Sequence, residues 1–245
     1  MSQACKGETL DELALRHGAD KSSEQHAFTA VYERFLEPLR ELPITMLEIG
    51  VFQGASVRMW HDYFPHARIY AIDFDAAARQ HSDERLTVLV GNQMDHEFLD
   101  TVVASTGPLD FVVDDGGHRP EQQLTSLFHL WEHLKLGGVY AIEDVHTSYL
   151  GRWSPGWRRP GTTIEVLKDL VDDVNSYWHQ RGARLSDVES VQFYPELCVI
   201  SKRPSWKTVR KGDPTQNEFL MLPDERYPDS TGAWLGPPGM PSTSE

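Results

Sequence analysis

The sequence is poor in cysteine and in long apolar runs, and each shortage narrows the class of protein. Its only cysteines are Cys5 and Cys198, so a disulfide framework is excluded and a reducing, cytoplasmic location fits best. No apolar run approaches the roughly 18 to 20 residues that span a bilayer, and the first residues do not resemble a signal peptide. We therefore expect no membrane partner.

Positive charge is also scarce. Lys and Arg number 23 against 37 Asp and Glu, which gives a formal net charge of −14 over 245 residues. Because binding to nucleic acids depends on clustered Lys and Arg, we expect no nucleic-acid partner. The length suffices for one domain with a substantial core and some additional segments.

Strand and helix patterns alternate through the middle of the chain, with short links between them. This alternation is typical of βαβ units, which build a parallel sheet with helices on both faces. The apolar runs are nearly continuous, as expected for strands that are covered on both faces. The patterns predict strands at 44–49, 67–73, 86–90, 109–114 and 137–143, and helices at 54–62, 75–81, 95–105 and 120–135.

The flanking regions complete an α/β fold with seven strands, mostly parallel. Before the first strand, a capping-box spacing at Thr9 and Glu12 predicts a helix that ends near Gly18, and a second helix follows at about 26–36. After the fifth strand come a Gly- and Pro-rich loop, a helix and an antiparallel hairpin. The expected organisation is an N-terminal helical cap (1–42), a main domain (43–203) with a lid loop (149–161), a helix at 162–180, a hairpin at 188–194 and 197–202, and an extended or partly disordered tail (204–245).

A turn with two glycines, Gly50 and Gly54, follows the first predicted strand. It lacks the G-x-G-x-x-G spacing of a dinucleotide fingerprint. An acid before the first glycine, here Glu48, is instead common in enzymes that bind S-adenosylmethionine. Gly50 would let the backbone approach that cofactor, and Glu48 would face its amino-acid end.

The next two predicted strands also end in polar residues. Asp73, at the end of the second strand, can accept hydrogen bonds from both ribose hydroxyls. Asn92 and Gln93, just past the third strand, are candidates for the adenine edge. We therefore predict an adenosyl-cofactor site at this edge of the sheet.

Acidic residues gather after the fourth and fifth predicted strands. Asp115, Glu143 and Asp144 supply oxygen ligands that suit Mg²⁺, Mn²⁺ or Ca²⁺ rather than zinc, although single acids at strand ends also cap helices or bind cofactors. His118 lies three residues after Asp115 on a Gly-Gly loop, and His146 lies three residues after Glu143. We predict that His118 acts as a general base near neutral pH, with His146 as the reserve.

The lid loop carries Trp153 and Trp157. Aromatic side chains on a loop above a site can stack on a sugar or ring system and exclude water. The same residues can equally fix the loop to the body of the protein or to another subunit. The sequence leaves both readings open.

At these residues the chain resembles the metal-dependent class I S-adenosylmethionine sugar O-methyltransferases of antibiotic biosynthesis, of the mycinamicin and calicheamicin types. The resemblance implies a Rossmann-like methyltransferase fold, Mg²⁺ on Asp115, Glu143 and Asp144, and His118 as the base. It also places Ser56 and Asp114 among the cofactor-binding residues. The similar segments are Gly18-Ala19-Asp20-Lys21, His26-x-Phe28-x-x-x-Tyr32, Leu47-Glu48-Ile49-Gly50-Val51, Ser56-x-Arg58-Met59-Trp60, Asp114-Asp115-Gly116-x-His118 and Ile142-Glu143-Asp144.

Two departures from the family pattern remove no ligand. Gly117 stands where Ser is frequent, and Phe28 stands where Tyr is frequent. The separate N-terminal domain of some macrolide enzymes has no counterpart in this sequence, so their substrate and assembly are not expected to carry over directly.

The expected function is Mg²⁺-dependent methyl transfer from S-adenosylmethionine to a deoxysugar hydroxyl of a glycosylated natural product. The resemblance also implies a homo-oligomer. Two alternatives stay open: a methyltransferase of a phenolic or other small acceptor, and a non-catalytic protein that binds the adenosyl cofactor.

Overall fold

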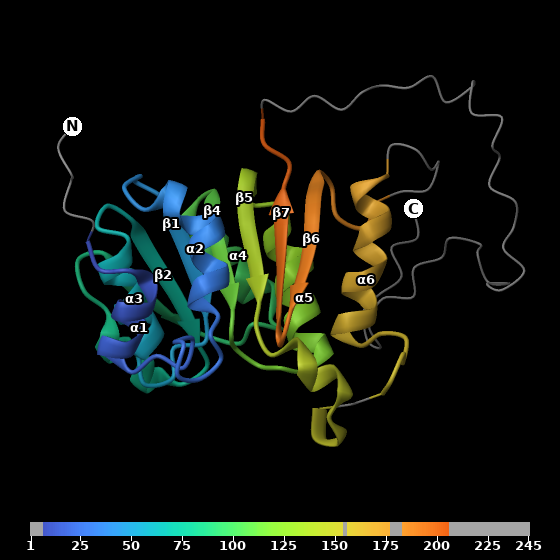
Figure 1. Ribbon diagram of the computed structural model, residues 1–245, viewed down its shortest axis with the longest axis horizontal. Coiled ribbons are helices and arrows are strands. Elements are labelled where there is room, and N and C mark those ends of the chain that lie inside the picture. Colours follow the sequence, from blue (N-terminus) through green and yellow to red (C-terminus); the bar gives the residue numbers. More distant parts are fainter. Residues whose placement is uncertain (1–6, 154–155, 177–182, 206–245) are drawn as a thin grey trace, which may run out of the picture.

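A single seven-stranded sheet organises the computed structural model, which describes residues 7–153, 156–176 and 183–205 (Figure 1). The strand order is β3-β2-β1-β4-β5-β7-β6, in which β1 to β5 pair in parallel and β7 pairs antiparallel with both β5 and β6. This arrangement confirms the predicted fold class. The strands are β1 (Thr45–Ile49), β2 (Arg68–Asp73), β3 (Leu86–Val90), β4 (Leu109–Asp114), β5 (Leu134–Ile142), β6 (Val188–Tyr194) and β7 (Leu197–Lys202).

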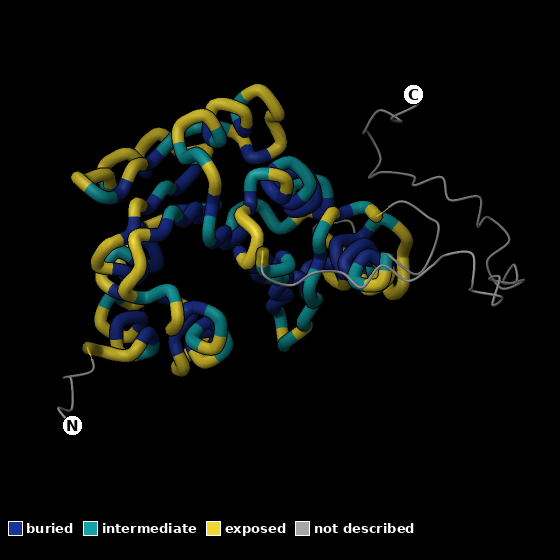
Figure 2. Tube along the Cα trace, turned by 90° about the horizontal axis from the view of Figure 1, so that it is seen from above, coloured by how far each residue is buried: buried dark blue, intermediate teal, exposed yellow. Residues whose placement is uncertain are grey.

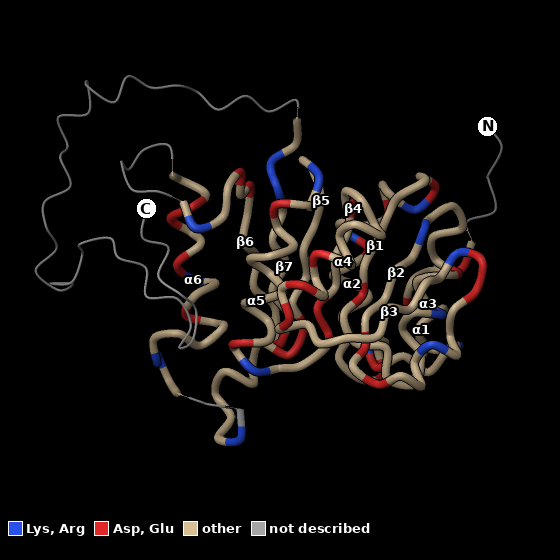
Figure 3. Tube along the Cα trace, turned by 180° about the vertical axis from the view of Figure 1, so that it is seen from behind, with Lys and Arg blue, Asp and Glu red and all other residues tan. Residues whose placement is uncertain are grey.

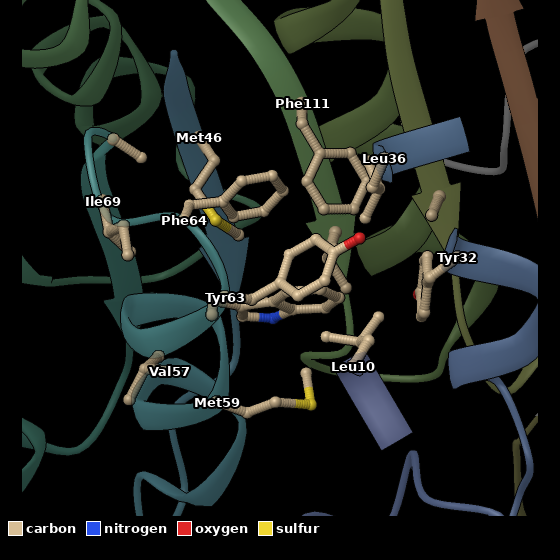
Figure 4. Close-up of a cluster of buried hydrophobic side chains, with 14 of the residues drawn as sticks. Leu10, Tyr32, Leu36, Met46, Val57, Met59, Tyr63, Phe64, Ile69 and Phe111 are labelled. Carbon is tan, nitrogen blue, oxygen red and sulfur yellow. The ribbon is translucent and has the colours of Figure 1, made fainter. Parts of the chain in front are cut away.

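Helices cover both faces of the sheet, and the sheet is buried between them (Figure 2). One hydrophobic cluster joins the sheet to the first three helices, and a second joins it to the last three. Figure 4 shows the first cluster, in which Leu10 and Leu36 from the N-terminal helices meet Phe111 of β4. The helices are α1 (Leu10–His17), α2 (Thr29–Leu36), α3 (Ala55–Tyr63), α4 (His96–Thr106), α5 (Pro120–Trp131) and α6 (Thr163–Val174).

The strand register brings the ends of β1, β4 and β5 to one level. Ile49 pairs with Asp114, and Asp114 pairs with Ile142. The residues that follow these three strands therefore meet at one edge of the sheet, the place where open α/β sheets bind ligands. Acidic residues are frequent along the chain at the same edge (Figure 3).

Local signals placed most elements correctly. The capping box at Thr9 is present, because its side chain accepts from the Glu12 backbone N–H while the Glu12 carboxylate accepts from the Thr9 backbone N–H. The segment predicted as a helix at 75–81 is instead a short 3₁₀ helix, Ala76–His81. No helix among the described residues is both long enough and apolar enough to cross a membrane.

The boundary between α5 and β5 was predicted wrongly. The helix expected to end at residue 135 ends at Trp131, and β5 begins at Leu134 rather than at 137. Gly137 lies inside this strand with a φ of 85°, at an irregular stretch of the β4–β5 pairing. A glycine inside a strand often marks such an irregularity, so the strand continues through it. The helix predicted at 162–180 ends at Val174, and residues 175–176 form a turn. Residues 177–180 of that prediction, and residues 206–245 of the predicted tail, lie outside the described residues.

Candidate functional site

A cavity of about 660 Å³ opens where β1 to β4 end. Five of the residues singled out in the sequence line it together: Gly50, Asp73, Asn92, Gln93 and Asp115. The structure thus unites the predicted cofactor turn, the predicted ribose-binding acid and the first predicted metal ligand. We call this space the donor cavity.

Two aromatic side chains on the rim of the donor cavity were missed in the sequence. Phe52 is 86% exposed and Phe74 is 85% exposed, and both line the cavity. Large apolar side chains that are exposed beside a cavity are typical of ligand contacts, since their faces can stack on a planar ring. Their signal was available, because Phe74 directly follows the strand-end acid Asp73.

Gly50 allows two turns to touch. Its φ is 95°, and a Cβ at this position would lie 2.1 Å from the backbone oxygen of Asp115. The turn after β1 is therefore packed directly on the turn after β4, which only glycine permits. Gly54 also has a positive φ, of 76°, and stands just before α3, but it is not among the described residues that line the donor cavity.

The carboxylate of Asp73 ties the turn after β1 to the end of β2. Its Oδ2 accepts from the backbone N–H groups of Val51 at 2.8 Å and Phe52 at 3.0 Å, and its Oδ1 accepts from Asp75 at 2.8 Å. Although burial raises the pKa of Asp73, these hydrogen bonds hold it below its usual value. An ionised acid that lines the cavity is suited to accept hydrogen bonds from hydroxyl groups.

Asp114 is not among the described residues that line the donor cavity, and its role in cofactor binding stays a prediction. It is fully buried, and burial raises its pKa to about 7. The side chain of Gln93 connects it to the next loop, since Gln93 Nε2 donates to Asp114 Oδ1 at 3.2 Å and Gln93 Oε1 accepts from the Gly117 backbone N–H at 2.6 Å. This network positions the loop that carries His118.

Asp115, His118 and Asp144 form a compact group, with one ligand atom of each within 4.8 Å of the others. His118 Nε2 lies 3.4 Å from Asp144 Oδ2. Asp144 has a φ of 55°, a strained conformation for an acid that is frequent at functional sites. Two carboxylates beside an imidazole can hold a hard cation and orient a base.

The carboxylate of Glu143, the third predicted metal ligand, is hydrogen-bonded to two other side chains in this structure. Its Oε1 accepts from the Tyr32 hydroxyl at 2.5 Å, and its Oε2 accepts from Lys21 Nζ at 3.0 Å. Among the described residues, Glu143 does not share the group of Asp115, His118 and Asp144. Its role as a ligand stays a prediction.

Lys21 is the main residue of the site that the sequence reading did not assign a role. It is fully buried, and its Nζ donates to Asp115 at 2.6 Å and lies 3.9 Å from Glu48. Burial alone lowers the pKa of Lys21, but the charges of Asp115, Glu143 and Glu48 raise it well above the usual value. One signal pointed to it, because several acids at buried strand ends require a buried cation.

Glu48 lies in the core beside Lys21, not in the donor cavity. It is fully buried, its Oε1 accepts from Trp60 Nε1 at 3.2 Å, and burial raises its pKa to about 7. Ser56 is buried nearby and hydrogen-bonds to Glu48. Neither residue is among the described residues that line the donor cavity.

The reserve base His146 lies on the far side of Asp144. Its Nδ1 is 3.7 Å from Asp144 Oδ1 and 3.9 Å from Glu196 Oε1. Glu196 in turn is 2.7 Å from His26 Nδ1. Asp144 therefore stands between His118, toward the donor cavity, and a second group of polar side chains beyond it.

This arrangement combines three chemical capacities at one sheet edge. The donor cavity suits a nucleotide-like ligand with a ribose and a planar ring. The carboxylates suit a hard cation, and His118 suits removal of a proton from a bound hydroxyl.

Comparisons with known proteins agree with this chemistry. A protein-family profile described as "Methyltransferase domain" matches residues 47–145. A curated 8-demethyl-8-alpha-L-rhamnosyl tetracenomycin-C 2'-O-methyltransferase from Streptomyces olivaceus is 35% identical over 211 residues, which cover 79% of this chain and 54% of that protein. Mycinamicin VI 2''-O-methyltransferase from Micromonospora griseorubida is 36% identical over 176 residues, which cover 67% of this chain and 44% of that protein.

A solved structure shows the same arrangement of the fold. The MycE methyltransferase of the mycinamycin pathway, in complex with Mg, SAH and mycinamycin VI, aligns with a TM-score of 0.75 at 30% identity, over 82% of this chain and 57% of that one. The chain thus spans about half the length of the curated relatives it matches.

Proposed function

The chain carries a methyltransferase domain and is a homologue of the sugar O-methyltransferases of antibiotic pathways, and on that premise we propose that it methylates a deoxysugar hydroxyl of a glycosylated natural product. S-adenosylmethionine is the proposed methyl donor. The observation that carries the proposal is the joining of the donor cavity to the group of Asp115, His118 and Asp144, because Asp115 belongs to both.

The donor cavity fits the proposed cofactor in size and chemistry. Its volume of about 660 Å³ lies within the range of small-molecule sites. Asp73 would accept from the ribose hydroxyls, Asn92 and Gln93 would face the adenine edge, and Phe74 would stack on the ring. The turn at Gly50 would let the backbone approach the amino-acid end.

The carboxylates near His118 fit Mg²⁺. Asp115 and Asp144 would hold the ion, and Glu143 would join them by turning away from Lys21. When bound, the ion supplies a Lewis acid that stabilises the oxygen of an acceptor hydroxyl as it loses its proton. Lys21 would keep the neighbouring carboxylates ionised and in place.

His118 would take the proton of the acceptor hydroxyl as the oxygen receives the methyl group. Asp144, 3.4 Å from its Nε2, would orient the ring and stabilise its protonated form. Gln93 would hold the loop of His118 against the donor cavity through the Gly117 N–H. Because donor and acceptor are fixed side by side, positioning would supply much of the rate.

Titration calorimetry with S-adenosylmethionine and S-adenosylhomocysteine, with Mg²⁺ and then with chelator, tests the proposal. We expect binding of both in either condition. Methylation assays with a rhamnosyl tetracenomycin and with mycinamicin VI should show turnover only when the metal is present. Absence of cofactor binding in both conditions would overturn the proposal.

The same assays separate the alternatives. Turnover of phenols but not of glycosides would assign another acceptor class, and cofactor binding without any turnover would indicate a binding protein. Cytoplasmic location and homo-oligomeric assembly remain parts of the proposal, and sedimentation velocity tests the assembly.

A further inference from the structure

We call the group of Asp115, His118 and Asp144 the acid group. A second cavity, of about 380 Å³, lies on the other side of the acid group from the donor cavity. Its lining is mainly apolar and comes from the segment after β5, from α6 and from the β6–β7 hairpin. No described residue lines both cavities. The lining includes Val145, His146, Tyr149, Ile164, Phe193 and Tyr194.

The strand register places this cavity next to the acid group, at the same end of the sheet. Phe193 of β6 pairs with Cys198 of β7, and Cys198 pairs with Ile142, the last residue of β5. Asp144 follows Ile142 by two residues, and Val145 and His146, which come next, line the cavity. The cavity therefore begins where the proposed metal ligands end.

The lining of this cavity combines polar side chains, including His146, Lys168 and Glu196, with aromatic ones. His146 and Glu196 line the side near Asp144. Away from it, Tyr149 is 42% exposed and Phe193 is 41% exposed, and the Tyr149 ring lies 6.0 Å from that of Trp157. Exposed aromatic side chains gathered at one opening mark a contact surface for a ligand with a flat apolar part.

From this placement we propose that the second cavity binds the apolar ring system of the glycosylated acceptor while its sugar reaches the acid group. The inference rests on the proposed function and names its acceptor class. A glycoside has a polar sugar joined to an apolar aglycone, and the site presents polar side chains next to Asp144 and aromatic ones beyond. The acceptor hydroxyl and the sulfonium sulfur could then face the methyl carbon from opposite sides, as methyl transfer in line requires.

Two truncations and two probes test this assignment in the full-length chain with Mg²⁺ present. The variants are Phe193→Ala and Tyr149→Ala. The matched control is Leu136→Ala, which removes a 52% exposed side chain from β5 at the opposite end of the sheet. The probes are whichever glycoside the protein methylates, rhamnosyl tetracenomycin or mycinamicin VI, and methyl rhamnoside, a sugar without an aglycone.

We expect Phe193→Ala and Tyr149→Ala each to raise KM for the glycoside roughly tenfold, since each removes buried apolar contact. Their kcat, their affinity for S-adenosylhomocysteine and their activity on methyl rhamnoside should stay at wild-type values. Leu136→Ala should change nothing. Thermal unfolding of each variant confirms that it is folded, and either truncation suffices if the other fails to fold.

The possible failures are distinguishable. If the glycoside is methylated but both truncations leave its KM unchanged, or if methyl rhamnoside binds as tightly as the glycoside, this inference is wrong and the proposed function stands. If the truncations instead change sedimentation and not KM, the surface is a contact between two copies of the chain. If neither glycoside is methylated, the proposed function itself fails, and the acceptor assignment fails with it.

Discussion

The donor cavity and the second cavity are built from different parts of the chain. Strand-end turns with tightly packed backbone form the donor cavity, and Gly50 there leaves no room for a side chain. Side chains from a loop, a helix and an edge hairpin form the second cavity. The packed turns of the donor cavity tolerate little change, whereas single side chains of the second cavity can be exchanged without moving the sheet. We infer that donor binding is set by the fold and acceptor choice by a few side chains.

Replacement of the residue between the two cavities should have the largest effect. We expect His118→Ala to lower kcat by roughly three orders of magnitude, as loss of a general base does. Because His118 lines neither cavity, affinity for S-adenosylhomocysteine and KM for the glycoside should stay unchanged. Calorimetry and steady-state kinetics measure these three quantities.

His146→Ala is the matched control, since His146 also lies beside Asp144 but on the other side. It should retain kcat within a few fold. If instead His118→Ala stays active and His146→Ala is inactive, His146, which lines the second cavity, is the base, and His118 is not.

Lys21→Met should destabilise the protein by about 3 kcal/mol, the second largest effect. The substitution leaves the buried carboxylates of Glu48 and Glu143, and the partly buried carboxylate of Asp115, without their cation. Urea unfolding of the variant at pH 7 measures the loss. Lys135→Met, which removes an exposed Lys paired with Asp110, is the control and should cost under about 1 kcal/mol. Equal losses in the two variants would refute a special role for Lys21.

Glu48→Gln should change the pH dependence of stability. The pKa of Glu48 is raised to about 7 from its ordinary 4.5, so its contribution to stability is full below about pH 4.5 and is lost as pH rises toward 7. Relative to wild type, the Gln variant should therefore gain roughly 2 kcal/mol between pH 5 and pH 7. Urea unfolding at both pH values measures this gain, and a constant difference would show that Glu48 does not titrate in that range.

Phe74→Ala should have the smallest effect, and it tests most directly whether the two cavities bind different ligands. Loss of the exposed ring should weaken S-adenosylhomocysteine binding about tenfold. KM for the glycoside should stay unchanged, the reverse of the pattern expected for Phe193→Ala. If both variants alter both affinities, the two cavities act as one site.

The sequence predicted the donor side well because its signals are local. Each strand end, its acid and its following turn lie within a few residues of one another. The sequence alone therefore assigned Gly50, Asp73 and Asp115 to one edge of the sheet. His118 was placed by the same reasoning. The early start of β5 was not predicted, because its pairing with β4 overrode the local pattern there.

The contacts that the sequence reading missed all join distant segments. Lys21 meets Asp115 and Glu143 across 94 and 122 positions of the chain, and no local pattern reports such a contact. The partners of Glu48 and Asp114 were missed in the same way. Both carboxylates are buried, Glu48 accepts from Trp60 and Asp114 accepts from Gln93, and their roles in cofactor binding stay predictions. The second cavity depends on a hairpin, a helix and a loop whose relative placement only the fold decides.

The ammonium of Lys21 has a consequence for where this chain can be cut. The family profile begins at residue 47, and the N-terminal helices look from the sequence like a removable cap. Yet the segment before β1 supplies both Lys21 and Tyr32 to the buried carboxylates. A fragment starting at residue 43 would keep every strand of the sheet and lose the counter-charge inside it. We expect such a fragment to be recovered only in acid, where the stranded carboxylates can take up protons.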